Sequence, residues 1–119
     1  MPNGKICYVE IPATSIEASA AFYEKVFAWE IRTRGDGERA FNDTTGQVSG
    51  TWVLGRTPNS TPGMVTYVMV DDIQATLNKI MSAGGKVATP RTSLDHGDAY
   101  ATFLDPAGNL VGLYQEPVR

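Results

Sequence analysis

Hydrophobic and polar positions along this chain follow two alternating periods, one typical of strands and one typical of helices. An apolar stretch at residues 5–11 predicts a strand that ends at Pro12, because proline donates no hydrogen bond to a sheet. Apolar side chains then recur at helical spacing over residues 16–27, after the capping pattern Thr14-Ser15-Ile16-Glu17, in which Thr14 is the expected cap. The pattern predicts a turn at residues 34–37 and strands at 29–33, 39–42 and 48–54.

The same order of elements restarts in the second half of the chain. Residues 56–63 are rich in proline, serine, threonine and asparagine, and this composition predicts a linker. A strand at 64–70 is expected to follow, and then a helix that is capped by Asp71 and stopped by Gly84-Gly85. The apolar stripe of this helix is formed by Ile73, Leu77, Ile80 and Met81. Three more strands are predicted, at residues 86–89, 100–104 and 109–114.

The two halves also match residue by residue. Ile16 matches Ile73 at an offset of 57 residues (73 − 16), and residues 41–50 (FNDTTGQVSG) match residues 103–112 (FLDPAGNLVG) at an offset of 62 (103 − 41). The growth of the offset predicts extra loop in the second copy, around residues 93–98. A repeat this short indicates two units that must pack on each other, because neither buries its apolar face alone.

Length, charge and cysteine content narrow the class of protein. A chain of 119 residues predicts a single domain over residues 1–119. The net charge of −3 and the lack of a basic run argue against a nucleic-acid partner. No apolar run approaches the roughly 18 residues of a membrane span, so no membrane association is expected. The single cysteine, Cys7, cannot form an internal disulfide, which favours a cytoplasmic location.

Several segments occur in the order found in one known superfamily. They are Glu10-Ile11-Pro12, residues 21–29 (AFYEKVFAW), Val70-Asp71-Asp72-Ile73, Gly84-Gly85-Lys86-Val87 and Asp105-Pro106-Ala107-Gly108-Asn109. Together they resemble the vicinal-oxygen-chelate superfamily of glyoxalase I, extradiol dioxygenases, and bleomycin- and fosfomycin-resistance proteins. The resemblance implies an α+β fold in which two tandem βαβββ units, at about residues 4–55 and 63–115, form a strongly curved sheet around a cleft, with the helices outside. It also implies a homodimer.

One residue departs from the superfamily pattern. Ala28 stands where members usually carry glycine after the first helix. Alanine at this position predicts either a helix that runs on or a strained helix end.

The resemblance also places the metal ligands of the metal-dependent members at four positions. They fall on Tyr8 and Val65 in the first strand of each unit, and on Gly50 and Gly112 in the last strand. Glycine and valine have no donor group, and a tyrosine hydroxyl stays protonated at neutral pH. We therefore expect no metal and no other cofactor.

Strand alternation predicts which side chains line the cleft instead. If Tyr8 points inward, so does Glu10, while Cys7 faces the first helix as a small core residue. The same parity places further side chains on the inner face, namely Trp52, Tyr67, Met69 and Tyr114. Such a wall suits a small-molecule ligand with a planar ring or a positive charge. The alternative is that these aromatic rings close the cleft by packing on one another.

Three functions remain open from the sequence. The first is metal-independent binding of an aromatic or cationic compound. The second is a metal-free isomerase, lyase or hydrolase with Glu10 or His96 as acid or base, although Glu10 is equally compatible with an ion pair to an arginine such as Arg32. The third is a metal enzyme whose ligands have moved to Glu10, His96 and Asp98.

Overall fold

A computed structural model of the chain describes residues 3–35 and 38–117, so that Asp36 and Gly37 of the predicted turn lie outside the described residues. Within that range the chain forms eight strands and two helices in the order βαβββ–βαβββ, which confirms the α+β class and both units. The chain divides into two compact units at residues 1–57 and 58–119, each with one helix and one four-stranded sheet. The predicted curvature around a common cleft concerns the placement of the units and stays a prediction.

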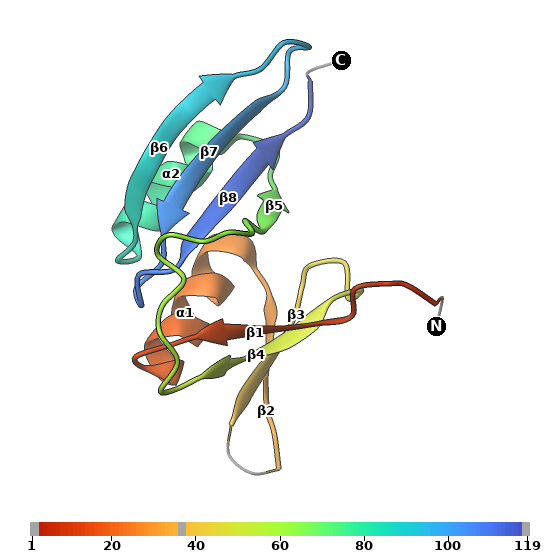
Figure 1. Cartoon of the computed structure of the whole chain (residues 1–119), viewed down its shortest axis with the longest axis vertical. Helices are drawn as coiled ribbons and strands as arrows, with labels where there is room; N and C mark the ends of the chain where they lie inside the picture. Colours follow the sequence, from red (N-terminus) through yellow and green to blue (C-terminus); the bar gives the residue numbers. More distant parts are fainter. Residues whose placement is uncertain (1–2, 36–37, 118–119) are drawn as a thin grey trace. The chain divides into compact units, whose positions relative to one another are not determined.

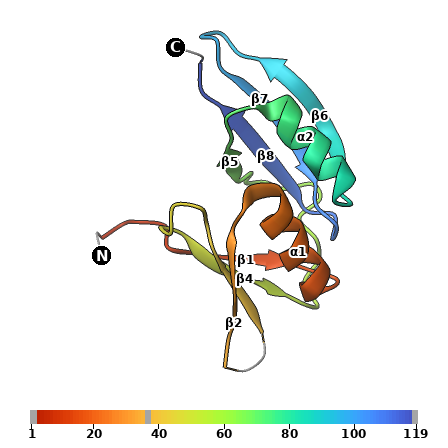
Figure 2. The ribbon, with the colours of Figure 1, turned by 180° about the vertical axis from the view of Figure 1, so that it is seen from behind.

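The first unit consists of one mixed sheet and the helix α1 (Ile16–Phe27). Its strands lie in the order β1 (Tyr8–Pro12), β4 (Ser49–Val53), β3 (Arg39–Asn42) and β2 (Glu30–Thr33). The pair β1–β4 is parallel and the other pairs are antiparallel. Figures 1 and 2 show α1 on one face of this sheet and the other face left without a helix.

The helix α1 begins and ends at identifiable caps. The hydroxyl of Ser15, not that of Thr14, accepts a hydrogen bond from the Ala18 amide at 3.2 Å, so the predicted cap was wrong by one residue. At the other end Ala28 adopts the left-handed conformation with φ 58°, and its amide bonds to the Glu24 carbonyl. The structure therefore has the strained helix end, not the longer helix.

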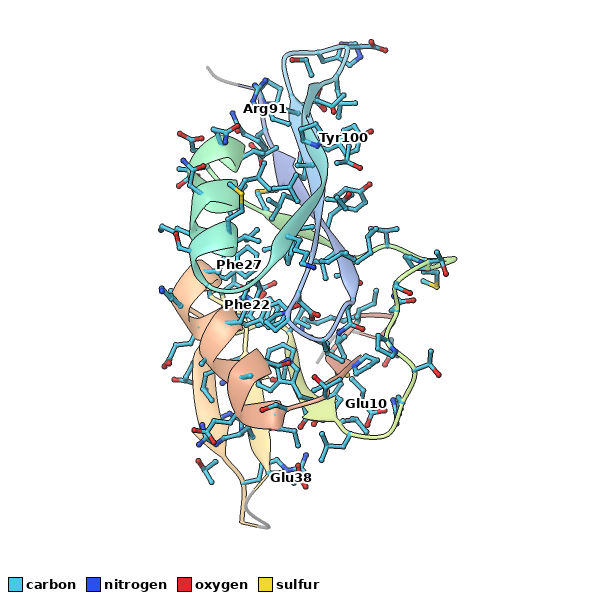
Figure 3. The ribbon with its side chains drawn as sticks, turned by 90° about the vertical axis from the view of Figure 1, so that its left-hand side faces the viewer. Glu10, Phe22, Phe27, Glu38, Arg91 and Tyr100 are labelled. Atoms are coloured by element: carbon cyan, nitrogen blue, oxygen red, sulfur yellow. The ribbon has the colours of Figure 1, made fainter. Side chains whose placement is uncertain are left out.

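The buried face of α1 packs on aromatic rings of the sheet. The Tyr23 ring stacks on Trp29 with centroids 4.8 Å apart, and Trp29 stacks on Phe41 at 4.5 Å. Trp52 completes the cluster, 4.9 Å from Phe41 and 6.0 Å from Tyr23. These contacts form the core of the first unit, and Figure 3 shows the neighbouring Phe22 and Phe27 on the same helix.

The second unit repeats this plan around α2 (Ile73–Ser82). Its strands lie in the order β5 (Tyr67–Met69), β8 (Leu110–Gln115), β7 (Ala99–Leu104) and β6 (Lys86–Ser93). Asp72, not Asp71, caps the helix by accepting from the Ala75 amide at 3.1 Å. The helix stops where Gly84 takes φ +100° and the Gly85 amide bonds to the Ile80 carbonyl, as the glycine pair predicts.

Several strands differ in length from the predictions. The strands β1 and β5 are shorter than the apolar runs at 5–11 and 64–70, and β4 is shorter than the predicted strand at 48–54. The strand β6 is longer than predicted and carries two register irregularities. Ser93 still pairs with Ala99, so the extra residues of the second copy lengthen a hairpin as well as its loop.

The expected linker is partly integrated into the second unit. The Asn59 amide donates to the Asn109 side chain at 2.8 Å, and the Leu110 amide donates to the Asn59 carbonyl at 2.9 Å.

No helix in the described part of the chain has the length and apolar composition needed to cross a membrane.

Candidate functional site

The face of the second sheet that points away from α2 carries a group of aromatic side chains. Strand register places Tyr67 beside Gly112, and Met69 beside Tyr114. Tyr114 in turn lies beside Tyr100 of β7, which Figure 3 shows on the side of the sheet opposite α2. The intervening residues, among them Leu113, Ala101 and Phe103, are buried on the helix side. We call the face formed by Tyr67, Met69, Tyr100 and Tyr114 the aromatic face.

The aromatic face is open to solvent at its edge strand. Tyr67 is 50% exposed and Met69 is 62% exposed. The Tyr67 ring lies over Gly112, where any added Cβ atom would collide with it. Gly112 therefore provides the space in which the ring lies flat on the sheet.

A carboxylate lies at one end of the aromatic face. The Tyr114 hydroxyl donates a hydrogen bond to Asp98 Oδ2 at 2.7 Å. This bond lowers the pKa of Asp98 below its usual value and raises the pKa of Tyr114 above its own. Asp98 is therefore a carboxylate at neutral pH, and the site combines aromatic surface with a negative charge.

The open face of the first sheet is polar, in contrast to the second. Glu10 forms an ion pair with Arg56 at 2.8 Å, and its side chain is 45% exposed. The Tyr8 hydroxyl accepts a long hydrogen bond from Arg34 at 3.5 Å. Arg32, which was a candidate partner for Glu10, donates instead to Asn42 at 3.3 Å. Figure 3 shows Glu10 on the side of its sheet that faces away from α1.

Trp52 does not share a face with Tyr8 and Glu10, which corrects the sequence prediction. The register pairs Tyr8 with Ser49 and Ile11 with Trp52, so Trp52 points toward α1. Its side chain is only 1% exposed and packs on Tyr23 and Phe41. Trp52 is thus a core residue of the first unit and is not accessible to a ligand.

A difference in hairpin length explains this error. In the first unit the Asp43 amide bonds to the Val48 carbonyl, whereas in the second the Asp105 amide bonds to the Asn109 carbonyl. The first hairpin is therefore one residue longer, and the offset between the copies changes from 62 to 61 after the turn. A shift of one residue reverses the face of every following side chain. The structural counterpart of Gly112 is Thr51, while Gly50 faces α1 beside Phe41.

Two further predicted positions, Cys7 and His96, are exposed to solvent. Cys7 is exposed and precedes β1, so the prediction that it packs in the core was wrong. His96 is exposed in the turn between β6 and β7, two residues before Asp98. Within residues 3–35 and 38–117, neither Cys7 nor His96 belongs to a group of three or more His, Cys, Asp or Glu side chains that could hold a metal ion.

One residue of the site, and one contact within it, were not identified from the sequence. Tyr100 belongs to the aromatic face, and strand alternation from Leu104 would have indicated its direction. The bond between Tyr114 and Asp98 joins residues of a strand and of a distant turn. No sequence signal marks such a contact, because it depends on the register of β7 against β8.

Comparison with known proteins identifies the family. The model of the Glyoxalase/Bleomycin resistance protein/Dioxygenase superfamily matches residues 5–113. The chain belongs to this superfamily. The match spans both βαβββ units, so the repeat and the fold of this chain are those of the glyoxalase superfamily.

Two relatives illustrate how this superfamily member compares with others. A glyoxylase-like domain-containing protein of Didymella fabae is 29% identical, over 97% of this chain and 96% of its own length. The putative glyoxylase CFP32 of Mycobacterium bovis is 27% identical over 91% of this chain. The chain spans 44% of the length of CFP32.

Solved structures of the glyoxalase superfamily have the same fold. The fosfomycin resistance protein FosX of Listeria monocytogenes matches with a TM-score of 0.79 at 14% identity, over 97% of this chain and 93% of its own. A family enzyme of Burkholderia phytofirmans matches with a TM-score of 0.76 at 20% identity, over 91% and 95%. At these identities the likeness establishes the fold alone.

The residues of this chain do not fit the divalent metal that the superfamily resemblance implies. The hydroxyl of Thr51 donates to the Arg39 carbonyl at 2.6 Å, and the Tyr67 ring covers Gly112. Val65 has no donor, and the Tyr8 hydroxyl is bonded by Arg34. Divalent ions of this class need imidazole, carboxylate or thiolate ligands, and none of these four positions supplies one.

Proposed function

We propose that this chain is a metal-independent small-molecule binding protein that holds an aromatic or cationic compound on its aromatic face. The observation that carries the proposal is the combination of Tyr67, Met69 and Tyr114 with the Asp98 carboxylate. Tyrosine rings attract planar rings and cations, and a methionine side chain adapts to ligand shape. An apolar surface with a few polar groups is the usual composition of a ligand site.

The alternative of a metal-free isomerase or lyase finds less support. Glu10 is half exposed and paired with Arg56, and such surface pairs are solvated and weak. His96 is exposed in a turn. Both side chains are open to solvent, whereas catalytic acids and bases usually lie in enclosed clefts.

The proposal extends to assembly and location. We propose a homodimer, because large apolar side chains are exposed, among them Ile6 and Met64, which is 88% exposed. A cytoplasmic location is part of the same proposal, on the basis of the single free cysteine.

Calorimetric titration with benzyltrimethylammonium, which combines a ring with a fixed positive charge, tests the binding function. We expect saturable binding that is the same before and after treatment with EDTA. A native mass spectrum of the same sample reports subunit number, and we expect a dimer without stoichiometric metal. One divalent ion per subunit that resists mild chelation would contradict metal independence. The binding function would be contradicted if the protein bound neither benzyltrimethylammonium nor a neutral aromatic compound.

A further inference from the structure

Two polar atoms at the aromatic face are shut off from solvent and have no hydrogen-bond partner within residues 3–35 and 38–117. They are Thr102 Oγ1 and Asp98 Oδ1, although the nearby amides of His96 and of Asp98 itself also lower the pKa of the Asp98 carboxyl. Thr102 is only 7% exposed, so its hydroxyl is nine-tenths buried. A buried polar atom without a partner costs free energy, and each such atom in a native protein calls for an explanation. A ligand that supplies the missing bonds is one such explanation.

Both atoms lie on the same side of the sheet. Tyr100 and Thr102 occupy alternate positions in β7 and point to one face, and Asp98, which directly precedes β7, accepts a hydrogen bond from Tyr114 on that face. Tyr100 lies beside Tyr114, and Thr102 lies beside Gly112, which the Tyr67 ring covers. The two unpartnered atoms therefore mark the two ends of the aromatic face.

The spacing sets the length of a ligand that would reach both ends. Asp98 and Thr102 are four residues apart in extended chain, so their Cα atoms are separated by about 13 Å. Because both side chains point to the same face, their polar atoms stay about this far apart, and two hydrogen bonds of about 3 Å each leave a span of about 7 Å between the polar groups of the ligand. A single aromatic ring with a short alkyl chain has this length.

The chemistry of the two ends differs. Asp98 already accepts the Tyr114 hydroxyl at Oδ2, so its second oxygen is a charged acceptor that suits an ammonium N–H. Thr102 offers a neutral hydroxyl that donates or accepts. Between them, the rings of Tyr67, Tyr100 and Tyr114 provide surface for an aromatic ring.

We propose that the aromatic face binds a protonated arylalkylamine with a hydrogen-bonding group on its ring, the ammonium on Asp98 and the ring substituent on Thr102. This inference rests on the proposed function and narrows its ligand class. Asp98 and Thr102 are then the residues that determine specificity.

Three small probes test the assignment by calorimetry. Tyramine carries both the ammonium and the ring hydroxyl, phenethylamine lacks the hydroxyl, and tyrosol replaces the ammonium by a neutral alcohol. We expect tyramine to bind more tightly than both of the other probes. Asp98→Asn should weaken tyramine and phenethylamine by about 10- to 100-fold and leave tyrosol unchanged, since a charge-assisted bond is lost. Thr102→Val should weaken tyramine and tyrosol by about 3- to 10-fold and leave phenethylamine unchanged.

Matched variants control for folding and for net charge. Asp95→Asn removes the same charge from the same turn and should leave all three affinities unchanged, and Thr102→Ser keeps the hydroxyl and should retain tyramine binding. If a variant fails to fold, the wild-type protein alone still tests the inference. Equal affinity of the wild-type protein for the three probes would overturn it. That result would leave the proposed function standing, since the face would still bind aromatic compounds. A failure to bind all three probes and benzyltrimethylammonium would overturn both.

Discussion

The residues that end the two helices differ in backbone strain. Ala28 holds φ 58° at the end of α1, where a Cβ atom is crowded by the backbone. Gly84 holds φ +100° after α2 without this cost. The two units thus end their helices differently, although their sequences repeat.

We expect Ala28→Gly to stabilise the protein by about 1 kcal/mol, because glycine removes the steric cost of the left-handed conformation. For a domain of this size the melting temperature should rise by about 4 °C, which calorimetry measures. The matched control is Gly84→Ala, where an added Cβ atom meets no other atom within 4 Å. That variant should lose a similar amount through the backbone alone, and a destabilised Ala28→Gly variant would contradict the argument.

The bond between Tyr114 and Asp98 makes a second prediction at the residue scale. Tyr114→Phe removes the largest cause of the lowered pKa of Asp98, so this pKa should rise toward its ordinary value of 3.8. Because the native pKa is lowered, the bond adds stability above the pKa of the unfolded chain, and this stability is lost as the pH falls through the folded pKa. An NMR titration of the Asp98 carboxyl carbon measures the shift. Tyr100→Phe removes a hydroxyl from the same face, and an equal shift in that variant would refute the assignment.

At the scale of elements, one residue in a turn decides which side chains a strand presents. The longer first hairpin turns Trp52 toward α1 and leaves Thr51 where the second unit has Gly112. As a result β4 contributes an aromatic ring to the core, whereas β8 contributes Tyr114 to the open face. The aromatic face therefore belongs to the second sheet alone.

The two repeat-matched glycines should respond differently to the same substitution. In Gly50→Ala the new Cβ atom collides with the Val9 carbonyl and the buried Phe41 ring, which cannot move aside. We expect a loss of about 3 kcal/mol in the free energy of unfolding, as for an overpacked core. In Gly112→Ala the collision is with the half-exposed Tyr67 ring, which can rotate, so the loss should be below about 1 kcal/mol. Urea denaturation measures both, and equal losses would show that Tyr67 is held as rigidly as the core.

At the scale of the whole molecule, a duplicated unit has acquired two different open faces. The first sheet presents charged and amide groups, with Glu10 paired to Arg56 and Asn42 bonded to Glu30 at 2.6 Å. The second presents tyrosines and a methionine. The superfamily model covers both units, so the difference between the two faces arose within one common fold.

The sequence by itself determined the elements and their order. Both helices followed from apolar spacing, and the repeat predicted two βαβββ units, because periodicity and turn residues act over short distances. The same alternation placed Tyr67, Met69 and Tyr114 on one face, since β8 follows its hairpin without an extra residue.

Only the tertiary structure decided the positions that depend on pairing between strands. The face of Trp52 changed with one residue in the hairpin at residues 43–48, an effect that the matching of FNDTTGQVSG with FLDPAGNLVG conceals. The ion pair of Glu10 with Arg56 and the bond of Tyr114 to Asp98 join residues far apart in the chain. Such contacts depend on strand register, and register is set by the packing of whole sheets and not by local sequence.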